Sequence, residues 1–282
     1  MYNLPKYISI SCLATTVAAA LIPQLGAQSV SFTLVAPAVL EERVKLVASE
    51  DQDRMQALKR LFEAAGCPQV SEQAVQGAPT PNIVCTLPGK EQNTVIVGAH
   101  YGKPAKGEGV IRNWSGAALL PSLLESLNKS PRRLTYVFVG FSDQQKGLRG
   151  SKAYAKDAKK DTVKAMLNIE SLGLGPTKIW LDQADKNLVS GMARVATSLK
   201  VPISGMNLDE GTEVDSQPFK DKSIPSVHVH SITSADAKIP GSEKDNAAAL
   251  HLDEYGNTYR LLAVYLAFLD NTLGMPATPA AK

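Results

Sequence analysis

The stretch Leu134-Thr-Tyr-Val-Phe-Val-Gly-Phe-Ser-Asp-Gln-Gln-Lys-Gly-Leu-Arg-Gly-Ser151 decides the fold. Its first half is apolar without polar alternation, which is typical of a strand that is buried on both faces of a sheet. A glycine-rich turn follows, and then a short helical pattern. This order of strand, turn and helix predicts an α/β protein, and it delivers Gln144 and Gln145 to the turn, where hydrolytic enzymes of this class place working groups.

Further apolar runs alternate with helical patterns along the chain. We expect strands at 70–75, 82–87, 94–99, 165–170, 178–181 and 226–230, and helices at 39–65, 115–128, 150–159, 184–199 and 252–273. Pro121 should kink the helix that contains it or delay its start. The pattern predicts three layers, with a mostly parallel central sheet between helices.

Length and composition narrow the classes of function. The chain has 282 residues, of which 44% are hydrophobic and 20% are charged, with a net charge of +3. These values fit one globular domain, which we place at 30–273, with a disordered tail at 274–282. No basic patch with interleaved aromatic residues stands out, so nucleic acid is not an expected partner.

The first 27 residues differ from the rest of the chain. Lys6 is their only charge, and an apolar run leads to Leu25-Gly26-Ala27. This pattern predicts a signal peptide at 1–27 and a secreted or periplasmic protein. A membrane anchor is the weaker alternative, because the run is short and interrupted by serine and threonine, so no stable span is expected.

Cleavage after Ala27 would leave two cysteines, Cys67 and Cys85. A hairpin of 70–75 and 82–87 would bring them together in an oxidising compartment. A disulfide that closes a loop of this size contributes about 3 kcal/mol. Two separately buried thiols are an equally open alternative.

The ends of the predicted strands carry five motifs in order. They are Val95-Ile-Val-Gly-Ala-His-Tyr101, Asn113-Trp-Ser-Gly116, Gly147-Leu-Arg-Gly-Ser-Lys-Ala-Tyr154, Asn168-Ile-Glu-Ser-Leu-Gly173 and Ile224-Pro-Ser-Val-His228. In this order the mature chain resembles the di-zinc aminopeptidases, metallopeptidase family 28. The resemblance implies a mixed, eight-stranded sheet and a pair of bridged zinc ions.

The resemblance also implies where the metal ligands and the general base should lie. His100 stands at a ligand position, but Gly102 replaces the carboxylate that supports it. Arg112 takes the place of the bridging aspartate. Gln144 takes the place of the general base, and Gln145 that of its neighbouring ligand.

Two more ligand positions complete this comparison. Glu170 survives as the later acidic ligand, whereas the position of the final histidine falls at Ser242. Arg112 would repel a dication at ~4 Å by several kcal/mol at an effective dielectric constant of about 20. We therefore predict no zinc pair and no cofactor, and we expect Arg112 and Glu170 to form an ion pair in its place.

Four more residues are assigned to the pocket: Trp114, Asp215, His228 and His230. The two histidines alternate along one strand, so they face the same side and could hold a single zinc with Glu170 or His100. The commoner outcome for such a pair is a structural role.

Three functions remain compatible with these residues. The first is a non-catalytic binding or interaction protein with a peptide, small molecule or protein as its unknown partner. The second is a residual metallopeptidase with a single or atypical zinc. The third is a structural protein in which side chains fill the active-site pocket that the resemblance implies.

Overall fold

A computed structural model describes residues 32–207, 209 and 212–274 of the chain. Their centre is one sheet of eight strands in the order β1-β2-β4-β3-β5-β8-β6-β7. The strands are β1 (Val70–Gln73), β2 (Asn82–Leu87), β3 (Thr94–His100), β4 (Thr135–Phe141), β5 (Val163–Ile169), β6 (Thr177–Ile179), β7 (Ile203–Gly205) and β8 (Ser226–His230). The signal peptide predicted at 1–27 and residues 275–282 of the predicted tail lie outside this part of the chain.

The middle of the sheet is parallel. β4, β3, β5 and β8 run in one direction, whereas β1 pairs antiparallel with β2, β2 with β4, and β6 with β8. This arrangement confirms the predicted mixed and mostly parallel sheet. The carboxyl ends of the four central strands meet at one edge, where polar side chains can converge.

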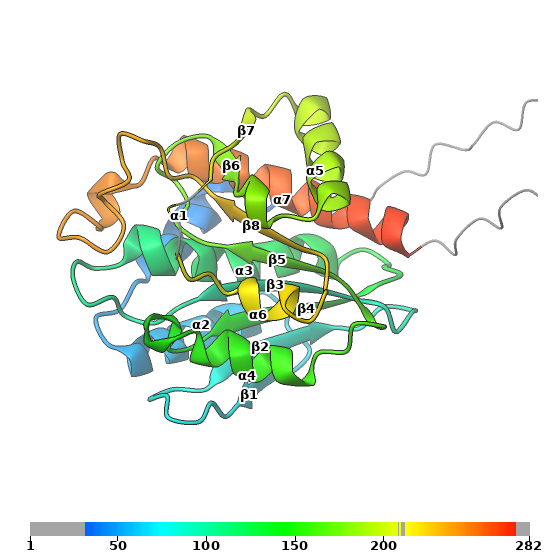
Figure 1. The fold of residues 1–282 in the computed structure, drawn as a ribbon, viewed down its shortest axis with the longest axis horizontal. Coiled ribbons are helices and arrows are strands. Elements are labelled where there is room, and N and C mark those ends of the chain that lie inside the picture. Colours follow the sequence, from blue (N-terminus) through cyan, green and yellow to red (C-terminus); the bar gives the residue numbers. More distant parts are fainter. Residues whose placement is uncertain (1–31, 208, 210–211, 275–282) are drawn as a thin grey trace, which may run out of the picture.

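Helices cover both faces of the sheet and give three layers (Figure 1). One face packs against α1 (Pro37–Lys45), α2 (Asp51–Ala64), α3 (Ser115–Asn128), α5 (Lys186–Leu199) and α7 (Leu252–Leu273) through the larger apolar core. The other face packs against α4 (Arg149–Asp157) and α6 (Gln217–Lys220) through a smaller core. The α/β/α architecture follows from strands that are apolar on both sides.

Some predicted elements differ from the observed ones. The helix predicted at 39–65 is two helices, because residues 46–50 leave the helical path between α1 and α2. The short elements β7 and α6 were not predicted, since three or four residues carry too little periodicity to detect. Pro121 lies inside α3 and does not delay its start. A π-helical turn, η1 (Val110–Trp114), leads directly into that helix.

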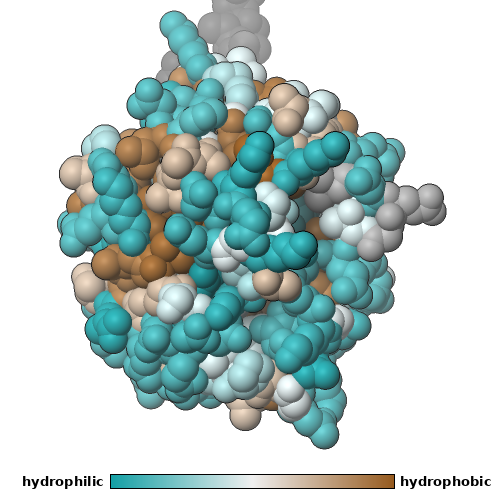
Figure 2. Space-filling model, turned by 90° about the vertical axis from the view of Figure 1, so that its left-hand side faces the viewer, coloured by the Kyte–Doolittle hydropathy of each residue, from teal (hydrophilic) through white to brown (hydrophobic). Residues whose placement is uncertain are grey.

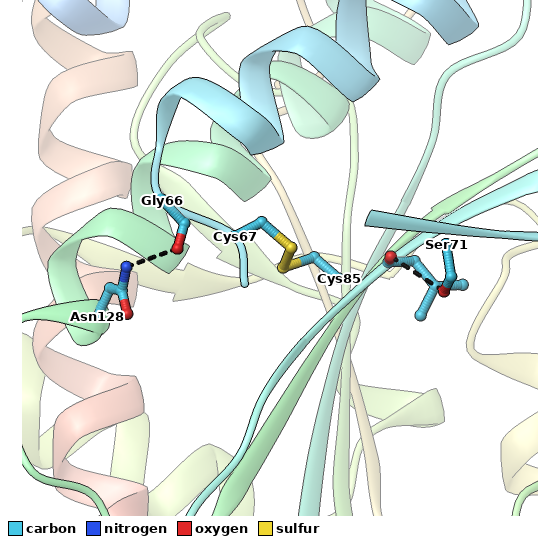
Figure 3. Close-up of a disulfide and its surroundings, with 6 residues drawn as sticks. Gly66, Cys67, Ser71, Cys85 and Asn128 are labelled. Atoms are coloured by element: carbon cyan, nitrogen blue, oxygen red, sulfur yellow. Dashed lines mark hydrogen bonds between the residues drawn. A yellow bond between two sulfur atoms is a disulfide. The ribbon is translucent and has the colours of Figure 1, made fainter. Parts of the chain in front are cut away.

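The two cysteines form a disulfide. β1 and β2 pair as the predicted hairpin, with Val70 opposite Cys85, and the bond joins Cys67 to Cys85 across a sequence separation of 18. Figure 3 shows how the bond ties the end of α2 to β2, beside a hydrogen bond from Asn128 to the Gly66 carbonyl. The disulfide that the sequence left open is thus present, and the α2 layer is covalently fixed to the sheet.

Among the residues that the structure describes, no helix is both long enough and apolar enough to cross a bilayer.

Candidate functional site

Polar side chains gather where the central strands end. His100 is the last residue of β3, Glu170 follows β5, and His228 lies in β8, which neighbours β5. The loops that follow β3 and β8 lie on the left of Figure 1, and Figure 2 looks onto this side, where hydrophilic residues surround separate hydrophobic areas. The parallel topology therefore brings these groups together, as the sequence predicted.

The centre of the site is a buried cluster of one histidine and two carboxylates. His100 Nδ1 lies 2.9 Å from Asp215 Oδ2 and 3.2 Å from Glu170 Oε2. The side chains of His100 and Asp215 are 1% and 0% exposed, and that of Glu170 is 10% exposed. Nδ1 carries a proton and donates it to Asp215 Oδ2, whereas Glu170 Oε2 lies within ion-pair distance of Nδ1 without accepting a hydrogen bond from it.

Electrostatics favour a charged imidazole in this cluster. Burial by itself would lower the pKa of His100, but the hydrogen bond to Asp215 and the charge of Glu170 outweigh burial, and the pKa is raised. Burial raises the pKa of Glu170 to about 7. The cluster can thus hold an imidazolium between two carboxyl groups, which compensates the buried charge of Asp215 without a metal.

His228 and His230 lie side by side, with ring centroids 5.5 Å apart, but they have different surroundings. The Nε2 atom of His228 lies 3.4 Å from Glu170 Oε1, and burial holds the pKa of His228 well below its usual range. His230 accepts a hydrogen bond from the Ile232 amide, so its Nε2 atom donates to the Met206 carbonyl at 3.2 Å. His230 is thereby fixed as a neutral, structural residue, whereas His228 adjoins the cluster.

An open cavity of about 210 Å³ lies beside the cluster. Its lining comprises residues from η1, from the turn after β4 and from three later loops: Arg112, Gln144, Glu170, Ser171, Met206, Asn207, Asp209, Thr212, Glu213, Ile232, Ala237 and Pro240. Gln144 donates from Nε2 to the Glu213 carbonyl at 3.1 Å, while its buried Oε1 atom has no hydrogen-bond partner among the described residues. The position that the family resemblance assigned to the general base therefore carries an amide that is held in the cavity wall.

Arg112 reaches this cavity because the carboxylate of Asp245 fixes the backbone of η1. Asp245 Oδ1 accepts from the Ile111 amide at 2.6 Å, and Oδ2 accepts from the amides of Arg112 and Gly241. Gly241 has a φ of 73°, and a Cβ atom there would lie 2.8 Å from Arg112 Nη1. The glycine thus leaves room for the guanidinium, a role that no sequence pattern indicated.

The predicted ion pair between Arg112 and Glu170 is not formed. Both side chains line the cavity, yet no salt bridge joins them, and Glu170 instead faces His100 and His228. The Glu170 pKa depends first on burial, and the charge of Arg112 is a lesser influence that lowers it. The prediction was wrong because Asp215 brings a second carboxylate to the cluster, so that His100 becomes the nearer partner of Glu170.

Three other residues of the predicted site lie away from the cavity. Gln145 is exposed on the turn, and Ser242 donates its hydroxyl to the Ile239 carbonyl at 2.8 Å. Trp114 is fully buried in the main core and donates from Nε1 to the Arg43 carbonyl at 3.2 Å. Trp114 is therefore a core residue and not a pocket residue, because η1 turns its side chain away from the cavity.

The residues present fit the donor chemistry of one metal ion, but not of two. His100, Glu170 and Asp215 each offer an atom, and these atoms lie within 4.8 Å of one another. One histidine and two carboxylates are a ligand set that zinc accepts. No second group of this kind occurs among residues 32–207, 209 and 212–274, and Arg112 holds a positive charge where the sequence comparison placed the bridging carboxylate.

Taken together, the mixed sheet, its covering helices and the polar cluster at the strand ends define a three-layer α/β protein with a candidate site at the carboxyl ends of its central strands. The model of peptidase family M28 matches residues 82–266, and the chain belongs to this family. No curated protein sequence matches the chain.

Solved structures agree with this fold. The LapA aminopeptidase of Legionella pneumophila has a TM-score of 0.73 at 17% identity, and the match covers 83% of this chain and 70% of that one. A glutaminyl cyclase from an Acidobacteriales bacterium has a TM-score of 0.72 at 14% identity, covering 87% of this chain and 98% of that one. BSAP, a zinc aminopeptidase from Bacillus subtilis, has a TM-score of 0.61 at 17% identity, and the match covers 66% of this chain and 49% of that one.

Proposed function

We propose that this chain is a non-catalytic, ligand-binding member of its peptidase family. One observation carries the proposal: the cavity at the strand ends is open, but its wall presents Arg112 and Gln144 where peptidase chemistry needs carboxylates. A guanidinium remains charged at every physiological pH and repels a dication. A primary amide has no useful basicity, and the loss of a general base typically lowers the rate by ~10²–10⁴.

The open cavity favours binding over a purely structural role. A filled pocket would leave no room for a ligand, whereas about 210 Å³ is free beside Glu170 and Gln144. Both of these side chains are buried and keep an oxygen atom without a hydrogen-bond partner among the described residues. Buried polar atoms in native proteins are normally satisfied, so a molecule that completes these bonds would bind favourably.

Export is part of the same proposal. The charge-poor apolar segment at 1–27 lies outside the described residues, but the disulfide between Cys67 and Cys85 supports an oxidising destination. We therefore place the mature protein in the periplasm or outside the cell.

A metallohydrolase with a single zinc is the second candidate, and the cluster of His100, Asp215 and Glu170 favours it. These three residues would hold the ion, which would supply Lewis-acid polarisation of a carbonyl oxygen. The Nε2 atoms of His100 and His228 have no hydrogen-bond partner among the described residues and are therefore available as metal ligands. This candidate lacks a base at position 144, and it requires a neutral His100, because an imidazolium cannot bind a metal through Nε2 while Nδ1 donates to Asp215.

Introducing glutamate at positions 144 and 145 tests whether Arg112 by itself prevents metal-dependent hydrolysis. We expect the double variant Gln144→Glu/Gln145→Glu to show no hydrolysis of amino-acid p-nitroanilides above the level of the native chain, because Arg112 still opposes a metal at the cavity. The measurement is initial velocity with zinc added and with a chelator added. Turnover that is sensitive to the chelator, in either the native chain or the double variant, would show that Arg112 does not exclude the metal.

A further inference from the structure

We propose that the cavity binds a small zwitterion, a free α-amino acid, with its carboxylate on Arg112 and its ammonium group on Glu170 and Gln144. This inference rests on the proposed ligand-binding function and specifies its ligand. It draws on the opposite charges of Arg112 and Glu170 in the cavity wall, on the oxygen atoms without hydrogen-bond partners among the described residues, and on the absence of an ion pair between Arg112 and Glu170.

Arg112 supplies the site for the carboxylate. Within the part of the chain that the structure describes, the guanidinium has no hydrogen-bond or ion-pair partner, although the η1 backbone that carries it is firmly held by Asp245. Asp245 engages backbone amides and leaves the Arg112 side chain free. A planar guanidinium prefers a carboxylate with two parallel hydrogen bonds, so an anion of this shape fits it best.

The opposite part of the wall supplies acceptors for the ammonium group. Glu170 Oε2 and Gln144 Oε1 are both buried and have no hydrogen-bond partner among the described residues. The Nε2 amide group of Gln144 is already bonded to the Glu213 carbonyl, so the oxygen atom is the part of this side chain that remains available. An ammonium group donates three hydrogen bonds and would satisfy both oxygen atoms.

The opposite signs of these two charges favour a zwitterion. Arg112 and Glu170 line the same cavity but do not touch each other, so a gap separates two groups of opposite charge. An α-amino acid carries its carboxylate and its ammonium group on one carbon atom, and it can fill such a gap with each charge facing its opposite. A simple anion would leave Glu170 unsatisfied, and a simple amine would leave Arg112 unsatisfied.

The size of the cavity agrees with a ligand of this class. Pockets for drug-sized molecules enclose ~300–1,000 Å³. The cavity here measures about 210 Å³, and Met206, Ile232 and Pro240 add apolar surface to its lining. A single amino acid with an apolar side chain fits this volume.

The direct test is calorimetric titration of the full-length native chain with each of the twenty L-α-amino acids. We expect saturable binding of at least one of them. The same amino acid should then be compared with its C-terminal amide, which lacks the carboxylate, and with the matching carboxylic acid that lacks the amine. Each analogue should bind about thirtyfold more weakly or worse, because it leaves one charged wall group unpaired.

Variants assign the two contacts. Arg112→Gln should weaken binding of the amino acid by about thirtyfold while changing the affinity for the amide little. Lys146→Gln is the matched control, since Lys146 is exposed on the turn after β4 and does not line the cavity. It removes the same charge nearby and should leave the affinity unchanged. The comparison of ligands on the native chain needs no variant, so it stands even if Arg112→Gln fails to fold.

The outcomes separate this inference from the proposed function. If no amino acid binds, or if the amide and the deaminated acid bind as tightly as the parent, the zwitterion inference is overturned while a binding function for some other ligand can still stand. If the native chain hydrolyses amino-acid p-nitroanilides with stoichiometric zinc, the proposed function itself fails. Binding that needs both charges and Arg112 supports the inference.

Discussion

Replacing Gly116 by alanine is expected to destabilise the protein by about 3 kcal/mol. Gly116 lies in the first turn of α3, where the helix approaches the end of β5. A Cβ atom would lie 2.2 Å from the Ile169 carbonyl oxygen and 3.1 Å from Ala99 Cβ. Because the nearest atom belongs to the backbone of a central strand, it cannot move aside without shifting the neighbouring Glu170, so the substitution should also disturb the site.

Gly256→Ala is the matched control. Gly256 lies in α7, and a Cβ atom there would meet nothing within 4 Å. Alanine has the higher helix propensity, so this variant should be more stable by up to about 1 kcal/mol. The measurement is urea unfolding followed by circular dichroism. Equal stability of the Gly116→Ala variant and the native chain would contradict the close approach of α3 to β5.

Removing the carboxylate of Asp215 should have an effect of similar size. Asp215→Ala is expected to lower the free energy of unfolding by about 3–5 kcal/mol, because it takes one partner from a buried, hydrogen-bonded charge pair. His100 would keep only Glu170, at 3.2 Å. Asp215→Asn retains an acceptor for the His100 proton and should lose less stability.

Two comparisons make the Asp215 prediction specific. Asp161→Ala changes an exposed aspartate and should alter stability by no more than about 0.5 kcal/mol. Addition of a chelator to the native chain should leave its unfolding curve unchanged, since the imidazolium and not a metal compensates the carboxylates. A native chain that loses several kcal/mol on chelation would show that a metal ion occupies the cluster.

The fold could be predicted from the sequence because its signals are long and uniform. Strands such as β3 and β4 are apolar on both faces, and α7 keeps a helical pattern over 22 residues. The break between α1 and α2 escaped prediction because apolar residues keep helical spacing across it. The short elements β7 and α6 depend on their neighbours in space, which no local pattern records.

The candidate site could be predicted in outline but not in its contacts. Strand order placed His100, Glu170 and His228 at one edge of the sheet, and the sequence also assigned Asp215 to the pocket. What the sequence did not reveal is that Asp215 binds His100 from a position 115 residues further along the chain. That contact determines the partner of Glu170, and the Arg112 side chain at the cavity is left without an ion-pair partner among the described residues.

The central claim is that Arg112 and an imidazolium stand in for the metal centre of the family. Zinc analysis of the purified chain, after incubation with excess zinc and exhaustive dialysis, tests this claim most directly when it is paired with an aminopeptidase assay on the same sample. The account predicts no stoichiometric zinc and no hydrolysis of amino-acid p-nitroanilides. Zinc bound at one or two equivalents per chain, together with chelator-sensitive hydrolysis, would contradict it.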